Sequence, residues 1–226
     1  MSPSSSTPEP APAPAPLPPR LPPDWRAWAR WGAGVLIIGL VALGLWRWWA
    51  TSGRDVTPIA WEDLAPPATA PLRPWNAIVI HHSATRKGSV AGIDSAHRQR
   101  GWDGIGYHFV IGNGNGMRLG TVEPTWRWRA QREGAHAGGG AQGRPYNQAG
   151  IGICCVGQFD EDTPDAWQEE RLADLIAELI RHVPTLSSAR IIGHGDVPGK
   201  DTNCPGKYLD VDRIRRLVRQ RLGESS

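Results

Sequence analysis

The stretch GHGDVPGKDTNCPG, residues 193–206, constrains the fold of this chain more than any other part of the sequence. It places His194 and Cys204 ten residues apart on a loop rich in glycine and proline. Far upstream, the strand-like run IVIHHSAT at residues 78–85 contains two further histidines. Two imidazoles and one thiolate would give zinc three protein ligands and leave a fourth position for water, which is typical of a catalytic zinc. We therefore expect a fold that brings this strand and the distant loop together.

The two histidines of the strand cannot both bind one metal ion. His81 and His82 are adjacent, so their side chains point to opposite faces of a strand. The alternation alone does not choose between them, because both faces of the run look buried. In the loop, Asp196 either orients a ligand from behind or is a plain carboxylate of the turn.

The sequence from residue 74 onward alternates strands and helices, which predicts an α/β fold with a single mixed sheet flanked by helices. Runs of apolar and β-branched residues predict strands over residues 77–82, 105–111, 150–156 and 189–192. Apolar residues at helical spacing predict helices over 89–100, after 163–164, and over 211–222. Thr163 is the expected N-cap of the second helix, with Pro164 in its first turn. Outward-facing arginines make one side of the last helix a solvated face.

The N-terminal third has a different composition. Residues 1–24 are mostly Pro, Ala and Ser and cannot bury enough apolar surface to fold, so they are predicted to be disordered. Residues 25–50 contain an uncharged apolar run with tryptophans on both sides, which predicts a transmembrane anchor helix. A cleaved signal peptide is the alternative. Residues 51–73 would then be a linker of roughly 60–80 Å if fully extended.

Charge and cysteine content exclude some classes of protein. The net charge of +3 and the isoelectric point near 9.0 are too mild to predict a nucleic-acid partner. Only three cysteines are present, and the neighbours Cys154 and Cys155 are too close for a relaxed disulfide. They are expected to be buried thiols in an apolar strand, so no disulfide framework is predicted.

Four segments together resemble a known family. IVIHHSAT, GWDGIGYHFVIGNG, NQAGIGICCVG and GHGDVPGKDTNCPG occur in the order found in zinc-dependent N-acetylmuramoyl-L-alanine amidases, which include phage lysozyme-type amidases and peptidoglycan recognition proteins. The resemblance covers roughly residues 74–222. It implies one zinc ion and hydrolysis of the bond between the lactyl group of muramic acid and L-alanine in peptidoglycan.

The resemblance also implies which residues do the chemistry. It places the metal on His81, His194 and Cys204. It makes Tyr107 catalytic, and a phenol with an ordinary pKa near 10 stays protonated at neutral pH and can donate to an oxyanion. Many relatives have lysine two residues before the cysteine ligand, where this chain has Thr202. We therefore expect Thr202 in that role, with Lys200, which is out of register, as the alternate.

The substrate cleft is expected to include His136, Asn147 and Trp102. The apolar segment predicts a membrane-anchored protein, and the activity that the resemblance implies would place its catalytic domain, residues 74–226, on the wall side of the cytoplasmic membrane. One alternative is a membrane-tethered receptor that binds peptidoglycan without cleaving it. Another is a phage-type lysis enzyme with a releasable N-terminal segment. The oligomeric state is not determined by the sequence.

Overall fold

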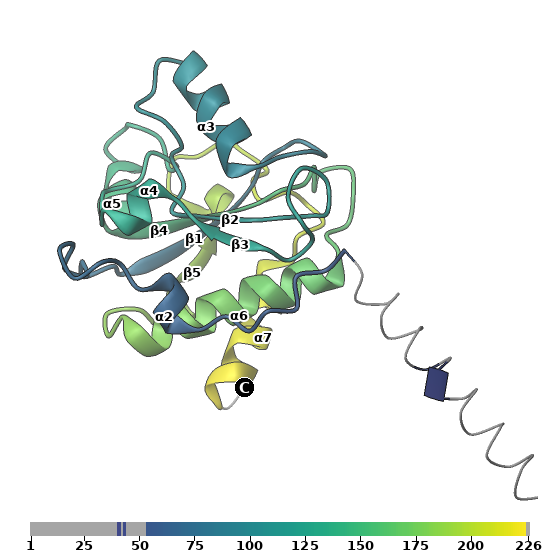
Figure 1. The fold of residues 1–226 in the computed structure, drawn as a ribbon. Coiled ribbons are helices and arrows are strands. Elements are labelled where there is room, and N and C mark those ends of the chain that lie inside the picture. The colour runs from purple at the N-terminus through teal and green to yellow at the C-terminus, as the bar shows by residue number, and fades with distance from the viewer. Residues whose placement is uncertain (1–39, 42, 44–52, 225–226) are drawn as a thin grey trace, which may run out of the picture. The chain divides into compact units, whose positions relative to one another are not determined.

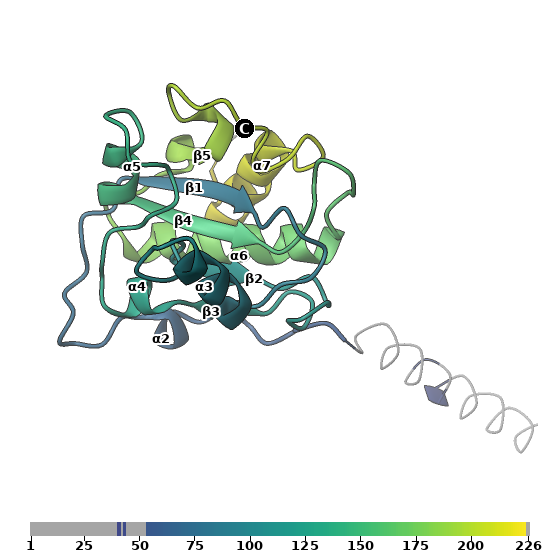
Figure 2. The same cartoon turned by 90° about the horizontal axis from the view of Figure 1, so that it is seen from above.

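In the computed structural model, which describes residues 40, 41, 43 and 53–224, a five-stranded mixed sheet lies at the centre of the domain (Figure 1). Its strands, in the order β3-β2-β4-β1-β5, are Val122–Pro124, Phe109–Ile111, Gly150–Cys155, Ala77–His82 and Ile191–Gly193. Strand β1 pairs in parallel with β4 on one side and β5 on the other, as seen from above in Figure 2. Only β3, at one edge, is antiparallel to its neighbour. The prediction of a single mixed sheet is confirmed.

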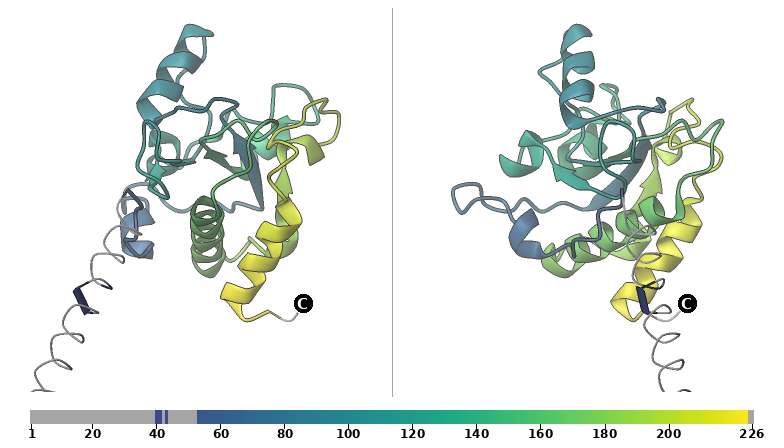
Figure 3. Two further views of the ribbon diagram at one scale, coloured as in Figure 1. Left: turned by 90° about the vertical axis from the view of Figure 1, so that its right-hand side faces the viewer. Right: turned by 45° about the vertical axis from the view of Figure 1, so that its right-hand side comes forward.

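Helices cover both faces of the sheet. The α-helices after residue 53 are α2 (Trp61–Leu64), α3 (Val90–Gln99), α4 (Trp126–Arg129), α5 (Arg144–Ala149), α6 (Ala166–His182) and α7 (Val211–Leu222). The two longest, α6 and α7, lie side by side under one face, whereas α3 stands on the opposite face (Figures 1 and 3). This division gives the sheet one face for the main core and another for the loops of the site.

The alternation of side chains along the strands separates two apolar clusters. The larger one contains Ile78 and Ile80 of β1 and Cys155 of β4, packed with Leu172 and Leu175 of α6. A smaller cluster on the other face is built from a few buried residues, which are Ile105, Val110, Met117, Cys154 and Val156. Both neighbouring cysteines are therefore buried thiols, as predicted, but they belong to different faces of β4.

One predicted strand is much shorter than expected. The apolar run at 105–111 forms a strand only over Phe109–Ile111. Side chains occupy the backbone groups that a longer strand would have paired, because Asp94 accepts from the amide of Ile105 at 2.8 Å and His97 accepts from that of Gly106 at 3.1 Å. A pattern of apolar residues does not reveal such competing acceptors.

One helix begins at a later residue than predicted, because a better N-cap is available there. Helix α6 begins at Ala166, because the Asp165 carboxylate accepts from the Trp167 amide at 2.8 Å and so replaces Thr163 as the predicted cap. Helix α7 spans the predicted residues 211–222. Its arginines form ion pairs, with Arg213 bonded to Glu169 at 2.9 Å and Arg221 bonded to both Glu170 and Asp174. The predicted solvated face is thus largely charge-compensated.

Most of the predicted N-terminal segments lie outside the described residues. The tail at residues 1–24 and the anchor at 25–50 are described only at Leu40, Val41 and Leu43. Within the described ranges, no helix has the length and apolar character needed to cross a membrane.

Residues 53–73, predicted as a free linker, pack against the domain instead. The amide of Asp55 donates to the carbonyl of Leu119 at 2.6 Å. Trp61 stacks on His182 with ring centroids 4.4 Å apart, and Leu64 is buried in the main core. The carbonyl of Leu64 also accepts from the Trp128 indole at 2.6 Å. The apolar side chains of this segment therefore complete the core rather than span a gap.

We expect Leu64→Ala to lower the free energy of unfolding by about 2–5 kcal/mol, because it leaves a cavity in the core. Urea unfolding of the protein measures this directly. The matched control is Val56→Ala in the same segment, whose side chain is 51% exposed and should change stability by less than about 0.5 kcal/mol. Equal, small effects of both changes would show that the segment does not stabilise the domain.

Candidate metal centre

Strand β1 determines which histidine faces the site. Because Ile80 points into the main core, the next side chain, His81, points to the opposite face. His81 is 1% exposed there. His82 returns to the main-core side, where it lies beside Phe159, with its Nε2 3.7 Å from Asp160. The alternation that left the choice open in the sequence is resolved by the packing of α6.

The structure brings His81 together with His194 and Cys204. Their ligand atoms all lie within 4.8 Å of one another. The Cys204 Sγ is 3.6 Å from the Nδ1 of His81, and the rings of the two histidines have centroids 4.6 Å apart. These three residues are 123 positions apart at most in the chain, so only the tertiary fold could assemble them.

A short turn after β5 places the other two donors. β5 ends at Gly193, and His194–Asp196 forms a 3-10 turn that lifts His194 over the end of the sheet. The amide of Gly195 donates to the carbonyl of Cys204 at 2.6 Å, which closes the loop onto itself. The Asp196 carboxylate accepts from the Gly193 amide at 2.9 Å, so it is a carboxylate of the turn.

The chemistry of these donors fits a zinc ion. The Nε2 of His194 is buried and, among the described residues, has no hydrogen-bond partner. Such an orphaned nitrogen is costly unless something else satisfies it. Burial raises the pKa of the Cys204 thiol to about 12, so a thiolate here needs a nearby cation. Two imidazoles and one thiolate are a known ligand set for a catalytic zinc.

His136 fixes the orientation of His81 from behind. Its Nδ1 lies 3.1 Å from the Nε2 of His81, and its own Nε2 lies 3.3 Å from the carbonyl of Gly150. A carbonyl can only accept, so the hydrogen of His136 is on Nε2 and its Nδ1 accepts from His81. The Nδ1 of His81 is then free of hydrogen and faces Cys204 as a ligand. Burial lowers the pKa of His136 to about 3, which keeps this arrangement neutral.

Asn147 supports the same loop. Its carbonyl oxygen accepts from the amides of His136 and Ala137, both at 2.8 Å, and its amide donates to the carbonyl of Gly138 at 3.0 Å. The carbonyl oxygen of this side chain and one of its two amide hydrogens are thus bonded to the backbone. The sequence analysis predicted that His136 and Asn147 line the substrate cleft. Both do border the pocket described below. Their hydrogen bonds, however, show that they support the metal centre.

Of the three donors, His194 lines a pocket of about 550 Å³. The pocket brings together six of the residues that the sequence singled out, which are Trp102, Tyr107, His136, Asn147, His194 and Lys200. Trp102 is 43% exposed and packs against His97, with ring centroids 4.5 Å apart. A second pocket of about 330 Å³ shares His97, Arg100 and Tyr107 with the first, so the two hollows meet at Tyr107.

The two candidates for the last catalytic role lie in different places. Lys200 lines the pocket beside His194, and its ammonium lies against Gly138, where a Cβ would be only 2.1 Å from Nζ. Burial first, and then the Lys200 charge, lower the pKa of His194. The hydroxyl of Thr202 instead accepts from the Cys204 amide at 3.2 Å, and Thr202 lines another hollow together with the candidate ligand Cys204.

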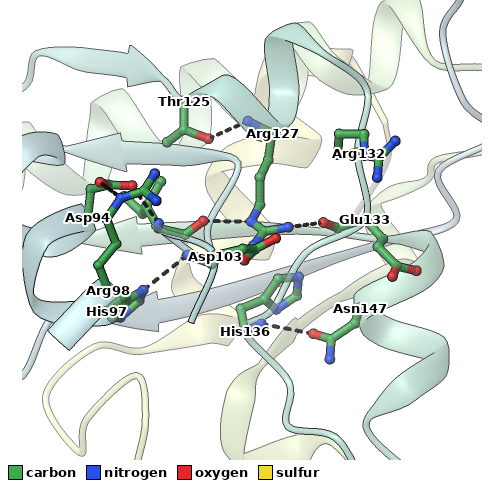
Figure 4. A network of polar contacts seen from close by, with 12 residues as sticks. Asp94, His97, Arg98, Asp103, Thr125, Arg127, Arg132, Glu133, His136 and Asn147 are labelled. Atoms are coloured by element: carbon green, nitrogen blue, oxygen red, sulfur yellow. Dashed lines mark hydrogen bonds and ion pairs between the residues drawn. The ribbon is translucent and has the colours of Figure 1, made fainter. Parts of the chain in front are cut away.

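A buried arginine that the sequence did not single out ties the loops of the site together (Figure 4). Arg127 is 3% exposed and donates to the carbonyl of Ile105 at 2.6 Å and to that of Glu133 at 2.7 Å, and it pairs with Asp103. These carbonyls flank the segments that lead to Tyr107 and His136. Nothing in the sequence WRWR distinguishes this arginine from the exposed Arg129, because its role depends on non-local partners.

Comparison with known proteins agrees with this geometry. The family described as N-acetylmuramoyl-L-alanine amidase matches residues 71–207, which is more than half of the chain. The chain belongs to this family. The resemblance predicted from the four segments is thereby confirmed for the amidase domain.

Individual relatives of this amidase-family chain include phage enzymes. It is 37% identical to the endolysin of Escherichia phage T7 over 38% of this chain, and it spans about half the length of that protein (50%). It is 32% identical to the endolysin of Enterobacteria phage K11, over 59% of this chain and 81% of the relative. Among solved structures, the amidase LysC from Clostridium intestinale URNW matches with a TM-score of 0.53 and 30% identity, over 69% of this chain and 92% of that one.

We expect Arg127→Met to lower the free energy of unfolding by about 2–4 kcal/mol, because it leaves the buried carbonyls of Ile105 and Glu133 without their donor. Thermal or urea unfolding measures the change. Arg132→Met is the control, because Arg132 is exposed and its side chain has no hydrogen bond among the described residues. If both variants were equally stable, the buried guanidinium would not be what holds these loops.

Proposed function

We propose that the protein is a zinc-dependent peptidoglycan hydrolase that cleaves the amide bond between the lactyl group of N-acetylmuramic acid and L-alanine. The observation that carries this proposal is the meeting of His81, His194 and Cys204, of which His194 lines a pocket together with Tyr107. Membership of the amidase family supports the substrate class. Because peptidoglycan lies outside the cytoplasmic membrane, the activity requires the domain to be on the wall side.

The residues of the metal centre have different roles in the proposed reaction. Zinc bound to these three donors would polarise the scissile carbonyl and lower the pKa of water to about 7. His136 keeps the metal-facing nitrogen of His81 free of hydrogen. An outer hydrogen-bonding partner of this kind fixes a ligand's tautomer and orientation.

Tyr107 is suited to donate a hydrogen bond to the developing oxyanion. Its ring lies 5.0 Å from that of His81, centroid to centroid, and it borders both pockets. Burial raises the pKa of the phenol well above 10, so it remains protonated and cannot act as a base at neutral pH. A donor fixed in a partly dry site stabilises negative charge more than the same donor in water.

Lys200 is better placed than Thr202 to assist Tyr107. The Lys200 side chain lines the pocket beside Tyr107 and His194, whereas Thr202 lines the hollow on the Cys204 side, where its hydroxyl accepts from the Cys204 amide and keeps its own hydrogen. A charged donor also forms stronger hydrogen bonds to an anion than a neutral hydroxyl does. We therefore assign the second oxyanion contact to Lys200, although the spacing in the sequence favoured Thr202.

The purified protein is expected to release stem peptides that begin with L-alanine from peptidoglycan, only with zinc present, as detected by mass spectrometry. Removing a hydrogen-bonding partner of a metal ligand typically weakens metal binding by about 10- to 100-fold. Cys204→Ser removes a ligand itself, so it should weaken zinc binding by more than this and abolish cleavage. Cys155→Ser is the control that should retain zinc, because Cys155 faces the main core, on the side of the sheet away from the metal centre. Tight peptidoglycan binding with one bound zinc and no cleavage would instead support the receptor hypothesis.

The roles of Lys200 and Thr202 can be separated by paired substitutions. Lys200→Ala should lower kcat by about 100- to 1,000-fold, the usual cost of losing one oxyanion donor. Thr202→Val, which preserves shape, should change kcat by less than about threefold, equivalent to under about 1 kcal/mol. The opposite ranking of the two variants, measured at saturating muropeptide, would return the role to Thr202.

A further inference from the structure

Tyr107 lies just before a strand, and its backbone is held by a single hydrogen bond. Strand β2 begins two residues later, at Phe109, so Tyr107 is not part of the ladder of the sheet. Within the described part of the chain, its amide has no acceptor, and its carbonyl accepts from one donor, the hydroxyl of Thr125 at 2.7 Å. The proposed reaction uses the phenol of Tyr107, so a contact that fixes this backbone also fixes how far the phenol reaches.

Thr125 uses all of its polar groups in such contacts. Its hydroxyl accepts from the Arg127 amide at 3.3 Å, and because a carbonyl can only accept, the hydrogen of the hydroxyl is donated to Tyr107. The amide of Thr125 donates to the carbonyl of His108 at 2.9 Å. One residue therefore holds two successive carbonyls of the segment that carries the phenol.

The fold keeps Thr125 in a fixed place. It is 2% exposed and is the N-cap of α4, whose Trp128 is fully buried and packs against Phe109 with ring centroids 4.8 Å apart. Arg127, also in α4, donates to the carbonyl of Ile105 at 2.6 Å. A β-branched side chain has few rotamers, so the direction of the hydroxyl is restricted as well. The start of α4 thus acts as a rigid support for residues 105–108.

We propose that Thr125 is a positioning residue for the reaction, whose hydroxyl holds the Tyr107 carbonyl and thereby sets the position of the phenol beside His81. The rings of Tyr107 and His81 have centroids 5.0 Å apart, so a small shift of this backbone moves the phenol relative to the metal centre. Valine has the shape of threonine but would leave the carbonyl without its donor. The inference rests on the proposed amidase activity, because it concerns the oxyanion donor that this activity uses.

Kinetics of the full-length protein test the proposal with two substitutions at one position. Thr125→Val should lower kcat by about 10- to 100-fold, the scale on which a misplaced catalytic group slows a reaction, with zinc content unchanged and KM within about twofold. Thr125→Ser keeps the donor and should retain kcat within about threefold of the parent.

Thr121→Val is the matched control, because Thr121 lies at the other end of β3 and its hydroxyl donates to Asp55 at 3.0 Å. It removes one side-chain hydrogen bond of the same kind, on the side of the N-terminal segment, and should leave kcat within about twofold of the parent. An equal loss of kcat in Thr121→Val and Thr125→Val would show a general packing defect and overturn the positioning role.

A double-mutant cycle separates positioning from a purely structural effect. In a Tyr107→Phe background, Thr125→Val should have no further effect on kcat, because the group that it misplaces is already absent. The same loss with and without the phenol hydroxyl would show that the two residues act independently, and so would refute the proposal. An equally large loss in Thr125→Ser would also refute it, since that variant keeps the hydroxyl.

NMR spectroscopy tests the contact even if the protein cleaves no peptidoglycan. The chain contains three tyrosines, so uniform ¹³C labelling of tyrosine gives three carbonyl resonances, of which Tyr146 and Tyr208 are internal references. Thr125→Val should shift the carbonyl and ring resonances of Tyr107 alone, and Thr125→Ser should return them toward their original positions. Unchanged ring resonances in Thr125→Val would refute the positioning role. Absence of cleavage by the parent protein, together with the expected shifts, would instead refute the proposed function and leave the placement of Tyr107 by Thr125 standing.

Discussion

The pleat of β1 is the constraint on which the rest of the site depends. Its isoleucines are committed to the core beneath the sheet, because α6 buries its own apolar stripe there. His81 must then face the other way, toward the loop that carries His194 and Cys204. A slip of one residue in the pairing with β4 would exchange the two faces and place His82 at the site. The burial of ordinary apolar residues thus selects the metal ligand.

Polar side chains, rather than secondary structure, hold the walls of the site. The segments before Tyr107 and around His136 are not paired as strands, and their backbone groups are satisfied by Asp94, Arg127 and Asn147. Buried backbone groups without partners are costly, so each of these contacts is a requirement of the fold. This scaffolding allows the loops to approach the donors closely and remain ordered without a continuous sheet.

Burial also keeps the side chains around the metal centre uncharged. Burial lowers the pKa of His81 and His136 and raises that of Cys154 and Tyr107, so all four favour their uncharged forms. A cation at the three donors would then be the main positive charge beneath the pocket, with Lys200 at its rim. Such a separation suits a reaction in which negative charge develops at one oxygen.

Sequence alone determined the class of fold, the extent of β1 and α7, and the candidate donors, because apolar periodicity and the residue types of a metal site are local properties. The residues left His81 and His82 as alternatives, the family resemblance favoured His81, and the packing of β1 places it at the site. The tertiary structure decided what depended on non-local partners. It shortened the predicted strand at residues 105–111, because side chains of α3 and Arg127 form hydrogen bonds with the backbone groups at its beginning. It packed residues 53–64 onto the core, because Trp61 and Leu64 found apolar surface there. It also placed Lys200 beside His194 and Tyr107 and Thr202 beside Cys204 in a different hollow, since the path of a loop in space, and not spacing along the chain, decides where a side chain lies.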